Sequence, residues 1–160
     1  MKYPIGIQTF EQIIEEGYVY VDKTDMVYSL ANEGKVYFLS RPRRFGKSLL
    51  LSTLRAYFEG RKELFKGLKI EAMEKNWHRH PIFHFDFNGI DYTMPNALRA
   101  NLEGYFAQWE EAYRVTPGPD FNPASRFERI IQAAVQQSGQ KVVVLVDEYD
   151  KSLLNEIKKD

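Results

Sequence analysis

The stretch VYFLSRPRRFGKS, residues 36–48, decides the fold of this chain. Its first four residues, Val36 to Leu39, are aliphatic or aromatic and predict a buried strand. The strand cannot continue beyond them, because Pro42 has no amide hydrogen and Gly46 permits unusual backbone angles. From Lys47 the apolar spacing becomes helical. The stretch therefore predicts a strand, a loop and a helix in succession.

The triplet Gly46-Lys47-Ser48 is the second half of a Walker A motif, placed where such a motif belongs. Backbone amides and the positive dipole end of the helix would face phosphates there, while the lysine reaches the β and γ groups. The Ser48 hydroxyl would be a magnesium ligand. The motif's first glycine is replaced by Arg41. The predicted nucleotide-binding residues are Arg41, Arg43, Arg44, Phe45, Gly46, Lys47, Ser48 and Leu49. The alternative is a solvated basic turn before an amphipathic helix.

A Walker B pattern follows far downstream, where the aliphatic run 142–146 ends in Asp147 and Glu148. An aspartate at the carboxyl end of a parallel strand lies in the ligand crevice of an α/β sheet. We expect Asp147 to hold magnesium through a water molecule. The expected catalytic residues are Glu148, which would orient the attacking water, and Lys47, which would stabilise charge on the phosphates. The alternative is that both carboxylates only end a strand and cap the helix after it.

The remaining pattern alternates between strands and helices. A short helix is expected from Thr9 to Gly17, and a second helix, capped by Asp22 or Thr24, ends at Gly34. The other expected elements are strands at 18–21, 81–87 and 142–146, the last buried on both faces, helices at 95–113, 122–137 and 151–159, and a mobile loop at 116–120. Alternating elements predict an α/β fold with a mostly parallel sheet, the three-layer sandwich of P-loop NTPases. We expect residues 1–34 to be an extension packed on this core. Residues 35–160 would be the amino-terminal part of the P-loop domain.

Composition narrows the class of protein. With 160 residues, 44% of them hydrophobic and 14% aromatic, the chain can bury one substantial core. The 22 basic and 22 acidic residues cancel, so net charge favours neither a nucleic-acid nor a membrane partner. Cysteine is absent, which fits a reducing compartment, and the longest aliphatic run is too short to cross a bilayer. We expect a cytoplasmic protein that does not enter the membrane.

Three histidines, His78, His80 and His84, lie close to Asp86 in the sequence and superficially suggest a metal site. Only His84 and Asp86 share a strand face, so a metal cluster is disfavoured. Asp86 alone would face the nucleotide crevice or, as we favour, be a hydrogen-bonded structural residue. The aromatic residues at helical spacing between 105 and 113 indicate core packing rather than base stacking.

The segment Asp22-Lys23-Thr24 leaves two interpretations open. These residues precede the predicted core strand and would contact the nucleotide base or brace the phosphate loop. Equally, Asp and Thr are the residue types that cap helix amino termini. The sequence pattern alone favours neither interpretation.

Three segments together resemble the AAA-ATPase-like family, P-loop ATPases abundant in Bacteroidetes: RPRRFGKSL at 41–49, YVDKT at 20–24 and VDEYDK at 146–151. The resemblance runs from Ile5 to about Leu154, and it implies ATP and Mg²⁺ as ligands and Arg41 as a regular feature. It also implies that members continue to a carboxyl-terminal domain similar to PD-(D/E)xK nucleases. We therefore expect this chain to be the amino-terminal portion of an ATPase.

ATPases of this type normally insert a later strand between the P-loop strand and the Walker B strand. We expect the chain by itself to hydrolyse ATP poorly or not at all, and the incomplete sheet to invite self-association. A second hypothesis is a non-hydrolysing module whose Arg41, Arg43 and Arg44 bind nucleic acid or a protein. A small-molecule P-loop kinase is a weaker third hypothesis.

Overall fold

The computed structural model describes residues 2–39, 46–88, 90–91, 94–118 and 122–147. The chain divides into two compact units, Met1–Arg79 and His80–Asp160, which are described separately here. The first unit contains residues from both sides of the predicted boundary at 34/35, and that boundary stays a prediction. Within the described ranges, no helix combines the length and the apolar character needed to cross a membrane.

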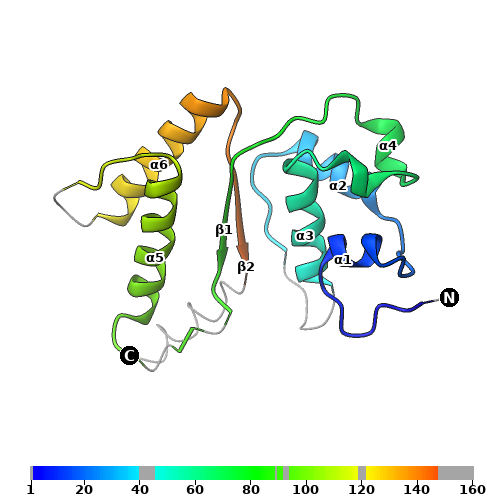
Figure 1. Cartoon of the computed structure of the whole chain (residues 1–160), viewed down its shortest axis with the longest axis horizontal. Helices are drawn as coiled ribbons and strands as arrows, with labels where there is room; N and C mark the ends of the chain where they lie inside the picture. The colour runs from blue at the N-terminus through cyan, green and yellow to red at the C-terminus, as the bar shows by residue number, and fades with distance from the viewer. Residues whose placement is uncertain (1, 40–45, 89, 92–93, 119–121, 148–160) are drawn as a thin grey trace. The chain divides into compact units, whose positions relative to one another are not determined.

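The described part of the first unit is helical (Figure 1). Its elements are α1 (Phe10–Glu15), α2 (Thr24–Glu33), α3 (Lys47–Phe58), the 3₁₀ turn η1 (Lys62–Phe65) and α4 (Lys69–Met73). The predicted helices after Thr9, after Asp22 and at Lys47 are confirmed. Gly17 and Gly60 follow α1 and α3 with φ of 67° and 70°, the left-handed conformation that glycine adopts at helix ends.

One apolar cluster holds these helices together. Phe10 and Phe65 are fully buried at its centre, with ring centroids 4.8 Å apart. Its buried members are Phe10, Val27, Ala56, Tyr57, Leu64, Phe65 and Ile70. Burying one such large side chain stabilises a fold by about 1.5–3 kcal/mol, so this cluster is the main reason that helices as short as α1 and α4 form.

The second unit contains a two-stranded parallel sheet and two helices (Figure 1). Its elements are β1 (Ile82–Asp86), α5 (Ala97–Ala112), α6 (Pro123–Ser138) and β2 (Val143–Asp147). Phe83 and Phe85 of β1 pack against α5 and α6, and the buried members of this cluster are Phe83, Phe85, Phe106, Ile130 and Ala134. The predicted strands, helices and parallel pairing are confirmed as elements, so the fold is mixed α/β.

Polar contacts define the helix pair of this unit. The Asn122 side-chain oxygen accepts hydrogen bonds from the amides of Ala124 and Ser125, at 3.0 and 3.3 Å, which caps α6. Glu110 of α5 is 4% exposed and accepts a 2.8 Å hydrogen bond from Nε of Arg126 on α6. A buried carboxylate needs such a partner, so this ion pair sets how α5 and α6 align.

Two predicted strands are wrong. Val19 of the segment 18–21 makes one backbone hydrogen bond, 2.8 Å to the Lys2 carbonyl, and the segment forms no strand. Residues 36–39 also form no strand, and Val36 and Phe38 are 90% and 73% exposed. A strand is stable only when neighbouring strands satisfy its backbone groups, and in the described residues β1 and β2 pair with each other.

The strand at the end of the second unit is confirmed, but its burial on both faces is wrong. Val144 and Val146 are 43% and 38% exposed, whereas Leu145 is 7% exposed. In the register, Val144 and Val146 lie beside Phe83 and Phe85, so they share the face that packs on α5 and α6. The helices cover β1 on this face and leave the valines of β2 exposed. The predicted helix at 151–159 lies outside the described residues.

Asp22 and Thr24 cap two helices at once. The Asp22 carboxylate accepts hydrogen bonds from the Thr24 amide (2.9 Å), the Thr24 hydroxyl (2.7 Å) and the Lys69 amide (2.8 Å). The Thr24 hydroxyl in turn accepts a 3.1 Å bond from the Ile70 amide. The two side chains therefore cap the starts of α2 and α4, which lie far apart in the sequence.

This double cap makes stability depend on pH. Partial burial raises the pKa of Asp22, but the hydrogen bonds from Thr24 and Lys69 outweigh it, so its pKa is lowered from the ordinary value of 3.8. A group with a lowered folded-state pKa stabilises the protein above its unfolded pKa and loses that effect as pH falls through the folded value.

We predict that Asp22→Asn lowers the free energy of unfolding by about 1–3 kcal/mol at pH 7, because an amide oxygen cannot accept all three bonds. The gap between wild type and variant should narrow as pH falls from 5 towards 3, measured by urea unfolding at each pH. Asp25→Asn is the control, because Asp25 forms an exposed 3.2 Å ion pair with Lys69 and should cost little. A gap that stays constant down to pH 3 would contradict the role of the ionised carboxylate.

Candidate functional site

The start of α3 is a glycine in the left-handed conformation. Gly46 is at the N-cap position with φ 77° and ψ 18°, a left-handed conformation that strains any residue with a side chain. The Gly46 carbonyl accepts the first helical bond from the Leu50 amide at 3.0 Å. In the described part of the chain, no N-cap side chain bonds to the start of this helix. The amide end of α3 is therefore built by glycine and not closed by a protein carboxylate or hydroxyl at the N-cap.

The charges around this turn also favour an anion. Lys47 and Ser48 are half-buried in the first turn of α3, and that turn contains no acidic residue. The amino-terminal end of a helix of this length has a partial positive charge, to which Lys47 adds. An anion with several oxygens, such as a phosphate, matches this arrangement. Leu49, the last predicted nucleotide contact, packs partly buried against the core of the first unit. Arg41, Arg43, Arg44 and Phe45 lie outside the described residues.

The second predicted element lies in the other unit. Asp147 is the last residue of β2, half-buried, and its carbonyl accepts a 3.2 Å bond from the Phe87 amide. The parallel register places Asp86 of β1 directly beside it. A carboxylate therefore lies at the carboxyl end of each strand, the edge at which α/β sheets bind ligands. Glu148 lies outside the described residues.

The Asp86 side chain is engaged locally. Its carboxylate accepts a 2.8 Å bond from the Asn88 amide, and its backbone amide donates to the Tyr105 hydroxyl at 3.0 Å. These bonds support the structural role that we favoured for it. His80 is also engaged, because its Nδ1 lies 2.9 Å from the Lys141 carbonyl. Across the described ranges, no group of three or more His, Asp or Glu side chains is arranged to hold a metal ion.

The structure answers the question that Asp22-Lys23-Thr24 left open. Asp22 and Thr24 bond to helix amides, and Thr24 is fully buried, so capping is the role that their contacts support. Lys23 between them is exposed. Sequence reasoning missed the partner amides at 69 and 70, because nothing in the spacing of the chain indicates a contact across that distance.

A shallow surface concavity of about 360 Å³ lies elsewhere in the first unit. It is lined by Lys62, Glu63, Lys66 and Glu71. Both signs of charge alternate around it, so it presents no net attraction for a phosphate or a cation. None of the predicted site residues lines it, and we give it no part in nucleotide binding.

Comparison with known proteins identifies the family of this chain. A family model described as "Predicted AAA-ATPase" matches residues 4–160. A protein of Azotobacter chroococcum mcd 1 described as "Uncharacterized protein in vnfD 5'region" is 42% identical over 157 residues. That match covers 98% of this chain and 30% of the relative, so the chain spans less than a third of its relative's length. No solved structure matches.

The family model covers almost the whole chain, including both predicted motifs, and family membership indicates nucleotide binding in general terms. The structure adds a glycine-opened helix with a lysine in its first turn, which fits that indication. The chain belongs to the predicted AAA-ATPase family.

Proposed function

We propose that this chain binds ATP with Mg²⁺ at the start of α3. The observation that carries the proposal is the first turn of that helix, which Gly46 opens in a left-handed conformation and which contains Lys47 but no acidic residue. Backbone amides would hold the phosphate oxygens, and Lys47 would reach the β and γ groups. Arg41, Arg43, Arg44 and Phe45 would complete the loop around the phosphates.

The donor atoms of the chain suit magnesium. Mg²⁺ prefers hard oxygen ligands, and we assign the Ser48 hydroxyl and, through a water molecule, the Asp147 carboxylate. When bound, the ion would neutralise charge on the phosphates. We assign Glu148 the orientation of the attacking water and Lys47 the stabilisation of charge that develops on the phosphate oxygens. Asp147 at the carboxyl end of a parallel strand supports this assignment.

We assign hydrolysis to the longer protein context and binding to this chain. The three-layer P-loop sandwich needs more strands than β1 and β2, which form the sheet of the described residues. Their parallel pairing and the exposed valines of β2 support a larger sheet, in which a further strand pairs with β2. That strand would contribute the remaining polar groups around the γ-phosphate.

We predict that a fluorescent ATP analogue binds the wild-type chain in the presence of Mg²⁺, and that Lys47→Ala weakens binding at least about tenfold, because a charge-assisted contact contributes roughly 1.5–3 kcal/mol. Titration with and without Mg²⁺ measures both effects. The control is Lys35→Ala, which removes an exposed lysine outside the predicted loop and should leave the affinity unchanged. Equal affinity of wild type and Lys47→Ala would reject the proposed site.

The Lys47→Ala variant also tests the alternative of a nucleic-acid-binding module, with a DNA duplex as the ligand. Under that hypothesis, affinity for a DNA duplex falls steeply with salt, depends on Arg43 and Arg44, and is insensitive to Lys47→Ala. Under ATP binding, the dependence on Lys47 is strong. The two outcomes are therefore opposite for one variant.

We also predict that the chain associates with itself at micromolar concentration. β2 is an edge strand of the described two-stranded sheet, its Val144 and Val146 are exposed, and such an edge invites further strands. Sedimentation velocity over a concentration series measures this directly. Replacing Val144 by Lys should shift the distribution towards monomer, since a charged side chain on an edge strand disfavours pairing with a further strand. A stable monomer for the wild-type chain at all concentrations would contradict the prediction.

A further inference from the structure

The hydroxyl of Ser52 joins α1 to the phosphate-binding end of α3. It accepts a 2.9 Å hydrogen bond from the amide of Phe10 and lies 2.9 Å from the carbonyl of Leu49, to which it donates. Phe10 is the first residue of α1, so its amide has no acceptor within that helix. A side chain of α3 therefore caps α1, and Thr9 at the N-cap position does not.

The carbonyl that accepts the Ser52 bond is that of Leu49, which directly follows Lys47 and Ser48. The Leu49 carbonyl also accepts a 2.8 Å bond from the hydroxyl of Thr53, which is 1% exposed. Side-chain bonds of this kind to a helix carbonyl alter the local bend of the helix. The hydroxyls of Ser52 and Thr53, which lie outside the predicted phosphate loop, therefore both bond to a carbonyl in the first turn of α3.

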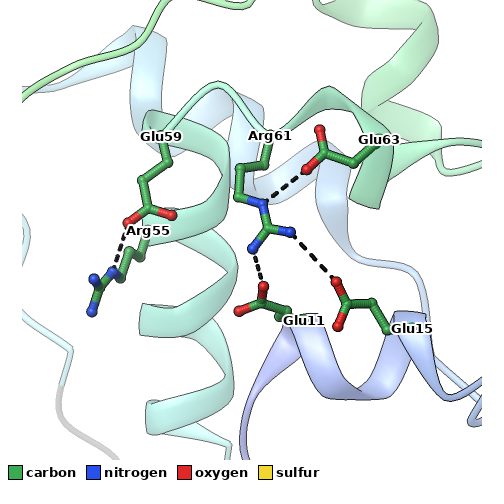
Figure 2. A network of polar contacts seen from close by, with 6 residues as sticks. All are labelled: Glu11, Glu15, Arg55, Glu59, Arg61 and Glu63. Atoms are coloured by element: carbon green, nitrogen blue, oxygen red, sulfur yellow. Dashed lines mark hydrogen bonds and ion pairs between the residues drawn. The ribbon is translucent and has the colours of Figure 1, made fainter.

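A second link between the same elements lies beyond the other end of α3. Arg61, which follows that helix, forms ion pairs with Glu11 and Glu15 of α1 and with Glu63 (Figure 2). The distances to Glu15 and Glu63 are 3.4 and 2.8 Å, and the carboxylates are 49–64% exposed. Exposed pairs contribute little to stability and are screened by salt. This link holds α1 but lies away from the turn that contains Lys47.

We propose that Ser52 is a positioning residue for nucleotide binding, acting through the Leu49 carbonyl to hold the first turn of α3 in register with α1. Ser52 touches no ligand in this role. Its hydroxyl holds the peptide unit between Leu49 and Leu50, whose amide bonds to the Gly46 carbonyl and so closes the first turn. The position of that turn decides how well the amides before it meet phosphate oxygens. This inference rests on the proposed function.

Titration of the full chain with a fluorescent ATP analogue and Mg²⁺ tests the inference. Ser52→Ala and Ser52→Cys should each weaken binding by about two- to tenfold, the change in an equilibrium constant that corresponds to one net hydrogen bond. Ser52→Thr keeps a hydroxyl that bonds to helix carbonyls and should restore the wild-type affinity. Arg61→Gln is the matched control, because it breaks contacts between the same elements at the far end and should leave the affinity unchanged.

Amide hydrogen exchange separates positioning from general stability. Ser52→Ala should speed exchange in residues 48–51 more than in residues 54–58, whereas Arg61→Gln should not. If Ser52→Ala binds the analogue as tightly as wild type while Lys47→Ala does not bind, the inference is wrong and the proposed function stands. If wild type itself does not bind, the proposed function fails and the inference fails with it. Weakening by Arg61→Gln equal to that by Ser52→Ala would also overturn the inference, because it would indicate loss of stability alone.

Discussion

The first unit depends on the packing of α3, because this helix buries its inner face against the core while its first turn begins at a glycine. Thr53, Ala56 and Tyr57 are buried on the inner face, whereas among the residues that the structure describes no N-cap side chain bonds to the start of the helix. A missing cap costs a helix about 1 kcal/mol, so packing must hold α3 in place. The Tyr57 hydroxyl adds a hydrogen bond to Glu74, and burial with this carboxylate partner raises the pKa of Tyr57. The helix can begin at a glycine, which has no side chain to cap it, because its inner face is firmly packed.

Long-range polar links then hold the elements that surround α3. α1 has six residues and α4 has five, well below the length at which a helix is stable in water. Each begins with amides that bond to a side chain from elsewhere: Ser52 for α1, and Asp22 with Thr24 for α4. α1 loses its cap if α3 moves, and α4 loses its caps if the start of α2 moves. The helices of this unit should therefore form and unfold together, as one cooperative structure.

Local signals explain which elements the sequence predicted correctly. α6 begins at Asn122-Pro123 and is followed by Gly139, so residues at both of its ends mark where the helix starts and stops. The strand at 143–147 is marked by its run of aliphatic, mostly β-branched residues. α4 and η1 have no comparable signal and were not predicted. The bond of Ser52 to Phe10 joins positions 42 residues apart, and sequence spacing does not encode such a contact. Of the predicted site, the structure describes only Gly46 to Leu49 and Asp147.

The wrongly predicted strand at 36–39 and the correctly predicted strand at 142–146 were predicted from the same kind of sequence pattern. Residues 36–39 and 143–146 are both apolar runs of the kind found in strands that are buried on both faces. Natural edge strands usually carry lysine, proline or a bulge that prevents pairing, and neither run contains one. In the structure both runs expose large apolar side chains, Val36 and Phe38 in one and Val144 and Val146 in the other. The apolar pattern alone therefore does not distinguish the two runs. Residues 143–147 form a strand because β1 pairs with them, and among the described residues no strand pairs with 36–39.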